Sequence, residues 1–202
     1  PFDRMLAAQA VVEAAVLGTA QVRAFGTAAM VALEAGQIGA FSGAQAAALT
    51  TAQLRAIDLS DLSSLSTSAI AALTSTQLAS FTSAQFAALS AEQLTALGAN
   101  QVLSMTPAQI AAMDPAQLNA LSTLQFSRLS TAQVAALTST QAGVLSTAQL
   151  AAIETGDIKS LTTAALRNLS SDQLDALTRD QLRALSNSQA NGLTTAQVNT
   201  LG

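Results

Sequence analysis

Few residues in this chain could do chemistry. None of its 202 residues is Cys or His, which excludes disulfides, thiolate chemistry, imidazole acid–base catalysis and metal sites built from Cys and His. The remaining candidates are hydroxyl side chains and two groups of charged residues. An enzyme would need those groups to converge on a pocket, so each group is considered in turn.

The first group is the densest charged cluster in the middle of the chain. It contains Glu154, Gly156, Asp157 and Lys159. Two carboxylates beside a glycine suggest a weak Ca²⁺ loop, but the alternating Asp or Asn ligands and the closing Glu of such a loop are missing. We interpret the cluster as a solvated, degenerate copy of the repeat described below, and we predict no metal site.

The second group lies nearer the carboxyl end and could form an acid pair with an arginine beside it. Its members are Asp172, Asp175, Arg179, Asp180 and Arg183. They occupy variable positions of the repeat, which is typical of surface ion pairs. We therefore predict no catalytic residue, no cofactor and no enzymatic activity.

The overall charge also limits the partners. Charged residues make up 10% of the chain, against about 25% in an ordinary soluble domain. The net charge is −4, and the arginines are too scattered to follow a phosphate backbone, so we expect no nucleic acid. The uncharged stretches 62–91 and 129–153 are interrupted by Ser, Thr or Gln in every eight residues, which argues against membrane insertion. Nothing indicates a small-molecule substrate.

The elements that position these residues are set by an eight-residue repeat. From Leu17 to Leu201 the octad recurs 23 times without insertion or deletion, as in Leu129–Ala136. Position one is always Leu, Ile, Met or Phe, and position six is always apolar. Position two is Ser or Thr in 16 octads, and position five is Gln in 18. Position eight is mostly Ala.

This pattern predicts the start of a helix in each octad. Ser or Thr followed three residues later by Gln is a capping box, in which the hydroxyl and the Gln side chain each accept a backbone N–H. Positions one and six then form a hydrophobic staple. Pro107 and Pro115 both stand at position three, the first helical residue, where a missing N–H costs nothing.

The predicted fold class is all-α: a solenoid of very short capped helices, one per octad. One continuous helix is excluded, because eight residues at about 100° each would rotate the apolar stripe by about 80° per octad. A β-solenoid is the remaining rival, and the Ala and Gln in each octad argue against it. Helices of about six residues are not stable alone, so successive octads must share a core. Three or four octads per turn are both compatible with the sequence.

The predicted organisation is an N-terminal capping helix over residues 1–16, followed by the solenoid of 23 repeats over 17–202. We expect the carboxyl end, which stops in register, either to continue or to stack on another molecule. Octads with Ala at position six, at Ala46, Ala142 and Ala190, are expected to be the loosest. Gln, never Glu, at position five suggests that equivalent side chains stack and hydrogen-bond along a row.

Whole octads carry a family resemblance. Leu-Ser-Thr-Ala-Gln-Val-Ala-Ala at 129–136 and Leu-Ser-Thr-Ala-Gln-Leu-Ala-Ala at 145–152 resemble octapeptide arrays in very large secreted or surface proteins of Gram-negative bacteria, which are often called adhesin-like. The resemblance implies an extracellular or cell-surface location and a stalk or fibre. A chain without Cys is compatible with export as an unfolded polypeptide.

The functional hypothesis is a structural, non-enzymatic extracellular protein that self-associates as a rod or filament subunit or serves as an adhesin stalk. Its physical basis is the low charge, because a surface with few repulsive groups tends to associate. The alternative is a monomeric binding solenoid that presents a concave surface to a peptide or glycan. The first predicts equivalent faces, and the second predicts unlike residues concentrated on one face.

Overall fold

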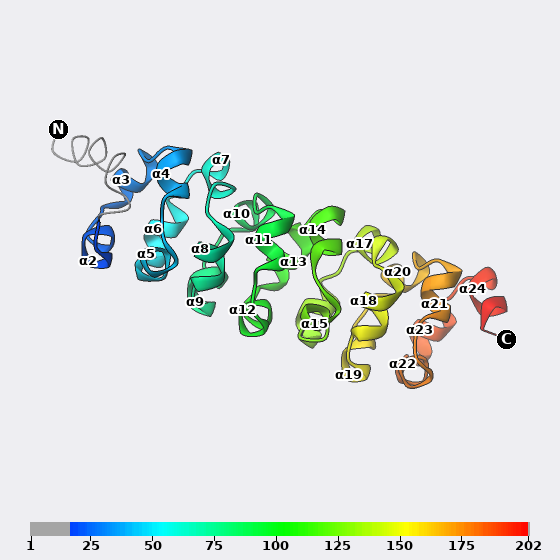
Figure 1. The fold of residues 1–202 in the computed structure, drawn as a ribbon. Helices are drawn as coiled ribbons and strands as arrows, with labels where there is room; N and C mark the ends of the chain where they lie inside the picture. Colours follow the sequence, from blue (N-terminus) through cyan, green and yellow to red (C-terminus); the bar gives the residue numbers. More distant parts are fainter. Residues whose placement is uncertain (1–16, 202) are drawn as a thin grey trace. The chain divides into compact units, whose positions relative to one another are not determined.

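A computed structural model describes residues 17–201 and contains 23 helices of four to six residues in that range, with no strand (Figure 1). The predicted capping helix over 1–16 lies outside the described residues. The all-α class is confirmed, and the β-solenoid is excluded for the described part of the chain. None of these helices is long and apolar enough to cross a membrane.

The chain divides into two compact units, Pro1–Ser104 and Met105–Gly202. In the described part of the first unit, one helix follows another at every octad. Its helices are α2 (Thr19–Arg23), α3 (Thr27–Val31), α4 (Ala35–Gly39), α5 (Gly43–Ala48), α6 (Thr51–Arg55), α7 (Leu59–Leu62), α8 (Thr67–Ala72), α9 (Ser75–Ala79), α10 (Ser83–Ala87), α11 (Ala91–Thr95) and α12 (Ala99–Ser104).

The second unit repeats the same arrangement. Its helices are α13 (Pro107–Ala112), α14 (Pro115–Ala120), α15 (Thr123–Phe126), α16 (Thr131–Ala135), α17 (Ser139–Val144), α18 (Thr147–Ala152), α19 (Thr155–Ile158), α20 (Thr163–Arg167), α21 (Ser171–Asp175), α22 (Arg179–Ala184), α23 (Asn187–Asn191) and α24 (Thr195–Thr200).

Most helices begin as the capping box predicts. In α10, Thr82 at position two has an extended backbone, and its hydroxyl accepts from the backbone N–H of Gln85 at 3.1 Å. The Gln85 side chain in turn accepts from the backbone N–H of Thr82 at 3.2 Å. Pro107 and Pro115 are the first residues of α13 and α14. Local chemistry within four residues therefore sets most of the starts, whereas α3, α7 and α19 begin without a side-chain cap.

The corner between two helices is built from ordinary backbone. Position two is extended, with ψ of 158° at Thr50 and 162° at Thr138, and this extended residue turns the chain before the next helix begins. No described residue, glycine included, has a positive φ. The corner therefore needs no glycine, and Ser or Thr can occupy the capping position of most octads.

Each turn of the coil holds three octads. Within each unit a helix packs against the third helix along the chain, as α2 does against α5 and α16 against α19. The sequence is compatible with three or four octads per turn, and this spacing of 24 residues shows that there are three. Position eight lies over the turn below: the side-chain amide of Asn168 donates to the carbonyl of Ser139 at 2.8 Å.

The core is formed by positions one and six. From Val22 to Leu174 every position-six side chain is essentially inaccessible to solvent, and position one is almost as deeply buried from Leu33 to Leu177. Both sets come from every octad, so each turn contributes six apolar side chains in three pairs. No octad encloses a core alone, which is the reason such short helices exist only as part of the coil.

The expectation that octads with Ala at position six are the loosest is wrong for Ala46 and Ala142. Both residues are fully buried. Their helices, α5 and α17, form with α8 and α20 the two most extensive helix pairs in the described residues. The helix above carries Ala instead of Gln at position five in both cases, at Ala69 and Ala165. Small residues on both helices permit a closer approach. Ala190, near the carboxyl end, is exposed.

A pair of cysteines tests the three-octad turn. A Cβ added at Gly43 would lie 3.0 Å from the Cβ of Ala72, slightly closer than the separation of about 3.8 Å in a disulfide. We expect Gly43→Cys with Ala72→Cys to form an intramolecular disulfide on oxidation. Gly43→Cys with Ser80→Cys, which is one octad further on, should stay reduced. Non-reducing electrophoresis and thiol titration distinguish them, since a four-octad turn would reverse the result.

Candidate functional site

The glutamine at position five joins two turns of the coil. In Gln93, which is buried, Oε1 accepts the backbone N–H of Ser90 at 2.7 Å. Its Nε2 donates to the carbonyls of Leu62 at 3.0 Å and Leu65 at 2.7 Å, one turn earlier. We call this donation the glutamine clamp, and we call the segment from position six of one octad to position one of the next a corner.

The clamp recurs through both units with the same spacing. Nε2 donates to carbonyls 28 and 31 residues earlier, in Gln141 at 2.8 Å to both Met113 and Ile110. The distances from Nε2 to the position-one carbonyls lie between 2.7 and 3.2 Å. In the first unit this clamp is made by Gln45, Gln53, Gln77, Gln85, Gln93 and Gln101. In the second unit it is made by Gln133, Gln141, Gln149, Gln173, Gln181, Gln189 and Gln197.

The clamp explains why position five is never Glu. The last carbonyls of a helix have no partner within it, and a buried carbonyl without a donor costs about 1–3 kcal/mol. A carboxylate accepts hydrogen bonds and donates none, so it cannot serve these carbonyls. The expected stacking between turns is confirmed. The expected partner was wrong, because Gln binds backbone carbonyls of the turn below and not the next Gln in the row.

Five octads lack the glutamine at position five. Asp61 and Asp157 replace it in α7 and α19, and alanine replaces it in three further octads, at Ala29, Ala69 and Ala165. Neither side chain has an amide to donate. The helices α7 and α19 are also among the shortest, with four residues each, and their first residue is not capped by a side chain.

The cluster of Glu154, Gly156, Asp157 and Lys159 lies on α19 and at its two ends. Glu154 and Lys159 are exposed, and Asp157, which is partly exposed, accepts a hydrogen bond from the hydroxyl of Thr131 on α16. The cluster is a degenerate octad that packs on the turn below. In the described part of the chain no three acidic, Cys or His side chains lie close enough together to hold a metal ion.

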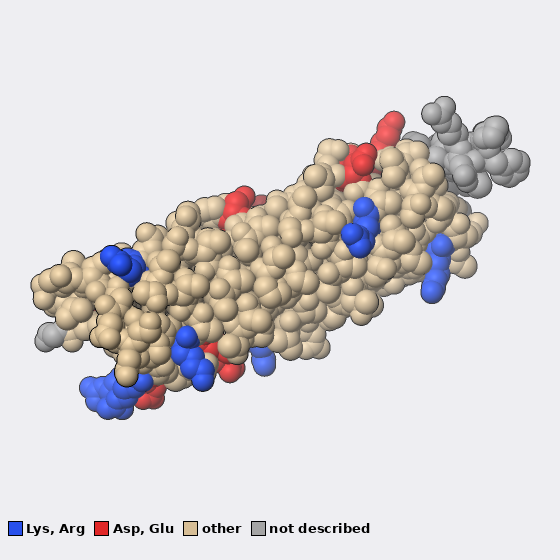
Figure 2. All heavy atoms as spheres, turned by 180° about the vertical axis from the view of Figure 1, so that it is seen from behind, with Lys and Arg blue, Asp and Glu red and all other residues tan. Residues whose placement is uncertain are grey.

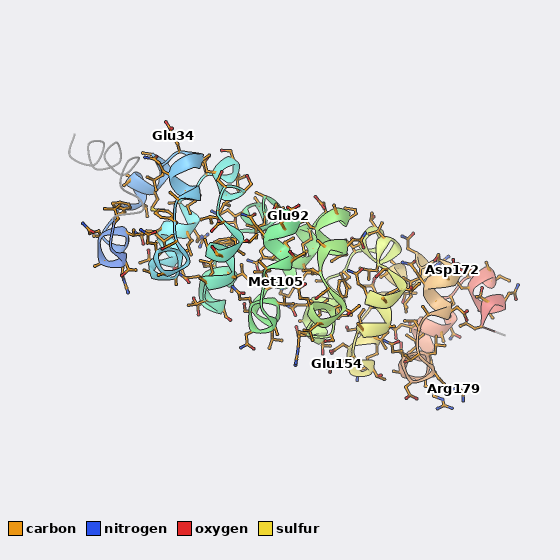
Figure 3. The ribbon with its side chains drawn as sticks, viewed as in Figure 1. Glu34, Glu92, Met105, Glu154, Asp172 and Arg179 are labelled. Carbon is orange, nitrogen blue, oxygen red and sulfur yellow. The ribbon has the colours of Figure 1, made fainter. Side chains whose placement is uncertain are left out.

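The second charged group is dispersed over α21 and α22. Within residues 17–201 one ion pair is present, between Arg183 and Asp180 at 3.7 Å, and both side chains are more than two thirds exposed. Figure 3 shows Glu154 and Arg179 at the outside of the coil, pointing away from its interior. α22 packs against α19, but within residues 17–201 no ion pair joins the two charged groups. An exposed pair such as Arg183 with Asp180 contributes little to stability.

Glu92 lies in the first turn of α11. Its carboxylate accepts from its own backbone N–H and from the hydroxyl of Ser90, and these hydrogen bonds hold the pKa of Glu92 below its usual value. A depressed pKa favours the folded state above the usual pKa of Glu, and the effect disappears as the pH falls through the lowered value. Glu92 is fully exposed, so we assign it a capping role at the start of α11.

Replacing a clamp glutamine by glutamate tests the site. Gln93→Glu keeps the length of the side chain but turns a carboxylate oxygen toward two carbonyls, so we expect a loss of about 2–4 kcal/mol in unfolding free energy at neutral pH. The loss should shrink in acid, because the protonated carboxyl can donate to one carbonyl. Urea denaturation at two pH values measures both effects.

Gln21→Glu is the matched control. Gln21 has the same cap, with Oε1 accepting from the Gly18 N–H at 2.8 Å, but its side chain is exposed. An equal loss for both variants would contradict the clamp.

Comparison with known proteins agrees with this arrangement. A model of the ALTTAQ repeat matches residues 15–43, 54–91, 110–147 and 150–187, which together are more than half of the chain. Residues 48–53 read Ala-Leu-Thr-Thr-Ala-Gln: the last residue of one octad, then position one, the cap and the clamp glutamine of the next. No curated protein matches the chain. The chain belongs to the ALTTAQ repeat family.

Proposed function

We propose that this chain is a structural, non-enzymatic protein that self-associates side by side as a rod or filament subunit or as part of an adhesin stalk. The proposal rests on what the octad does with its side chains. Positions one, two, five and six are used for the core, the cap and the clamp. Positions three, four and seven remain for contacts with other molecules.

The observation that carries the proposal is the low charge of these outward positions. Figure 2 shows few Lys, Arg, Asp and Glu side chains, some of them adjoining, on a surface that is otherwise uncharged on the side in view. Large apolar side chains are also exposed at outward positions: Leu103 on α12 is 55% exposed and Leu124 on α15 is 64% exposed. Such a surface has little electrostatic repulsion to keep copies apart.

Within the second unit, α13 and α16 offer the best surface for this contact. They pack side by side and contain no charged residue. Their exposed side chains are small: Thr131 at the start of α16, and the five residues Pro107, Ala108, Ala111, Ala132 and Ala135. We call these five residues the methyl face. Small side chains lose almost no conformational entropy on contact, and they allow two backbones to approach closely.

The proposed location is outside the cell or at the bacterial cell surface. Two features support it: the octads resemble arrays in large secreted or surface proteins, and the chain has no Cys that could form a wrong disulfide during export. A stalk made of one repeated octad can grow or shorten by whole turns without a change in its lateral surface.

Sedimentation velocity over a range of concentrations tests self-association. We expect the sedimentation coefficient to rise with concentration, and electron microscopy of the concentrated sample to show laterally associated particles. Ala108→Arg with Ala132→Arg puts like charges on the methyl face, and we expect this variant to remain monomeric with an unchanged unfolding midpoint.

Ala116→Arg is the matched control, because Ala116 is an exposed alanine at the same octad position on α14. It should leave association intact. A wild-type chain that stays monomeric at high concentration would overturn the proposal and favour a monomeric solenoid that binds a peptide or glycan. If Ala116→Arg reduced association as much as the double variant, the methyl face would be contradicted as the contact surface, but self-association itself would not.

A further inference from the structure

Two neighbouring turns in each unit are joined less completely than the others. A helix is held to the turn above it by two clamps, one at the corner before it and one at the corner after it. For α18, Gln173 binds the carbonyls of Ala142 and Leu145, and Gln181 binds those of Leu150 and Ile153. Both corners of α18 are therefore clamped.

At α16 both clamps are missing. By the spacing of the repeat, the corner before α16, from Phe126 to Leu129, faces Asp157, and the corner after it, from Val134 to Leu137, faces Ala165. Neither side chain can donate an amide N–H. In the described residues no hydrogen bond from a side chain of the turn above reaches the carbonyls of Leu129 and Leu137, whereas Leu121 and Leu145 receive one at 2.7 Å.

The same defect occurs in the first unit. The corner before α4, from Met30 to Leu33, faces Asp61, and the corner after it, from Ile38 to Phe41, faces Ala69. We call the contact between α16 and α19, and that between α4 and α7, the unclamped seams. The comparison covers the helices from α3 to α21 whose clamp partners lie in their own unit. Apart from α4 and α16, each of them has a glutamine opposite at least one of its two corners.

Each unclamped seam lies beside an unusually close contact. The next helix pair, α17 with α20 and α5 with α8, is packed more extensively than any other described pair. The far ends of α17 and α5 are also clamped, by Gln173 and Gln77. The junction between two turns is therefore held firmly at the alanine helix pair. At the unclamped seam beside it, the turns are held by apolar contact. In the second unit the hydroxyl of Thr131 also donates a hydrogen bond to the carboxylate of Asp157.

We propose that each unclamped seam is a hinge, at which one turn of the coil lifts from the next by pivoting on the tightly packed alanine pair. The lifted helices lose the packing that keeps such short segments helical, so their backbone amides become exchangeable. In a structural protein under load, such a hinge yields before the clamped turns do. The hinge does not depend on self-association.

Hydrogen exchange of the full chain under native conditions, read by mass spectrometry, tests the hinge. We expect the amides of α16 and α19 to exchange about tenfold faster than those of α18 and α21, which are clamped and belong to the same unit. Asp157→Gln restores one clamp and should slow exchange in α16 and α19 about fivefold. Asp157→Asn removes the same charge, but its side chain is too short to reach the corner carbonyls, so this variant should not slow exchange.

A second variant moves the defect. Gln173→Ala with Gln181→Ala removes both clamps of α18, and exchange in α18 and α21 should rise toward that of α16 and α19. The hinge is overturned if α16 and α19 exchange no faster than α18 and α21 in the wild-type chain, a comparison that needs no variant to fold. It is also overturned if Asp157→Gln and Asp157→Asn have the same effect.

Discussion

The need to satisfy the carbonyls at the ends of very short helices governs this structure. A helix of five residues has hardly any backbone group that is not terminal, so most of its carbonyls find no partner within the helix. In the coil these carbonyls lie at corners in the interior, where water does not serve them. In most octads one glutamine provides the donor, and because the carbonyls it reaches are 28 to 31 residues earlier, it also binds one turn to the next.

The oxygen and the nitrogen of this glutamine side chain form different hydrogen bonds, and only an amide can both accept and donate in this way. The oxygen accepts the capping N–H of its own helix, and the nitrogen donates to the turn below. Local and long-range structure are thereby coupled through one side chain: a helix that caps correctly also places its donor correctly. Ser or Thr at position two supports this by fixing the start of the helix, from which the position of the glutamine follows.

This division of labour leaves the outside of the coil largely unconstrained. Positions three, four and seven tolerate Ala, Ser, Thr, Pro and the scattered charges alike, since none of these residues takes part in the core. The absence of charge on neighbouring helices such as α13 and α16, and the departures from the repeat at α7 and α19, are the features that distinguish one part of the coil from another.

The sequence by itself determined the octad, the start of each helix, the all-α class and the buried positions one and six, because these depend on contacts within a few residues. It also showed that position five excludes Glu, but it did not identify the partner of the Gln. Only the tertiary structure decided that three octads make a turn, that the glutamines bind corner carbonyls, and that the helices of Ala46 and Ala142 pack closely instead of loosely. The physical reason is that the glutamine contacts join residues 28 to 31 positions apart. A repeat of eight looks the same whether three or four copies complete the turn.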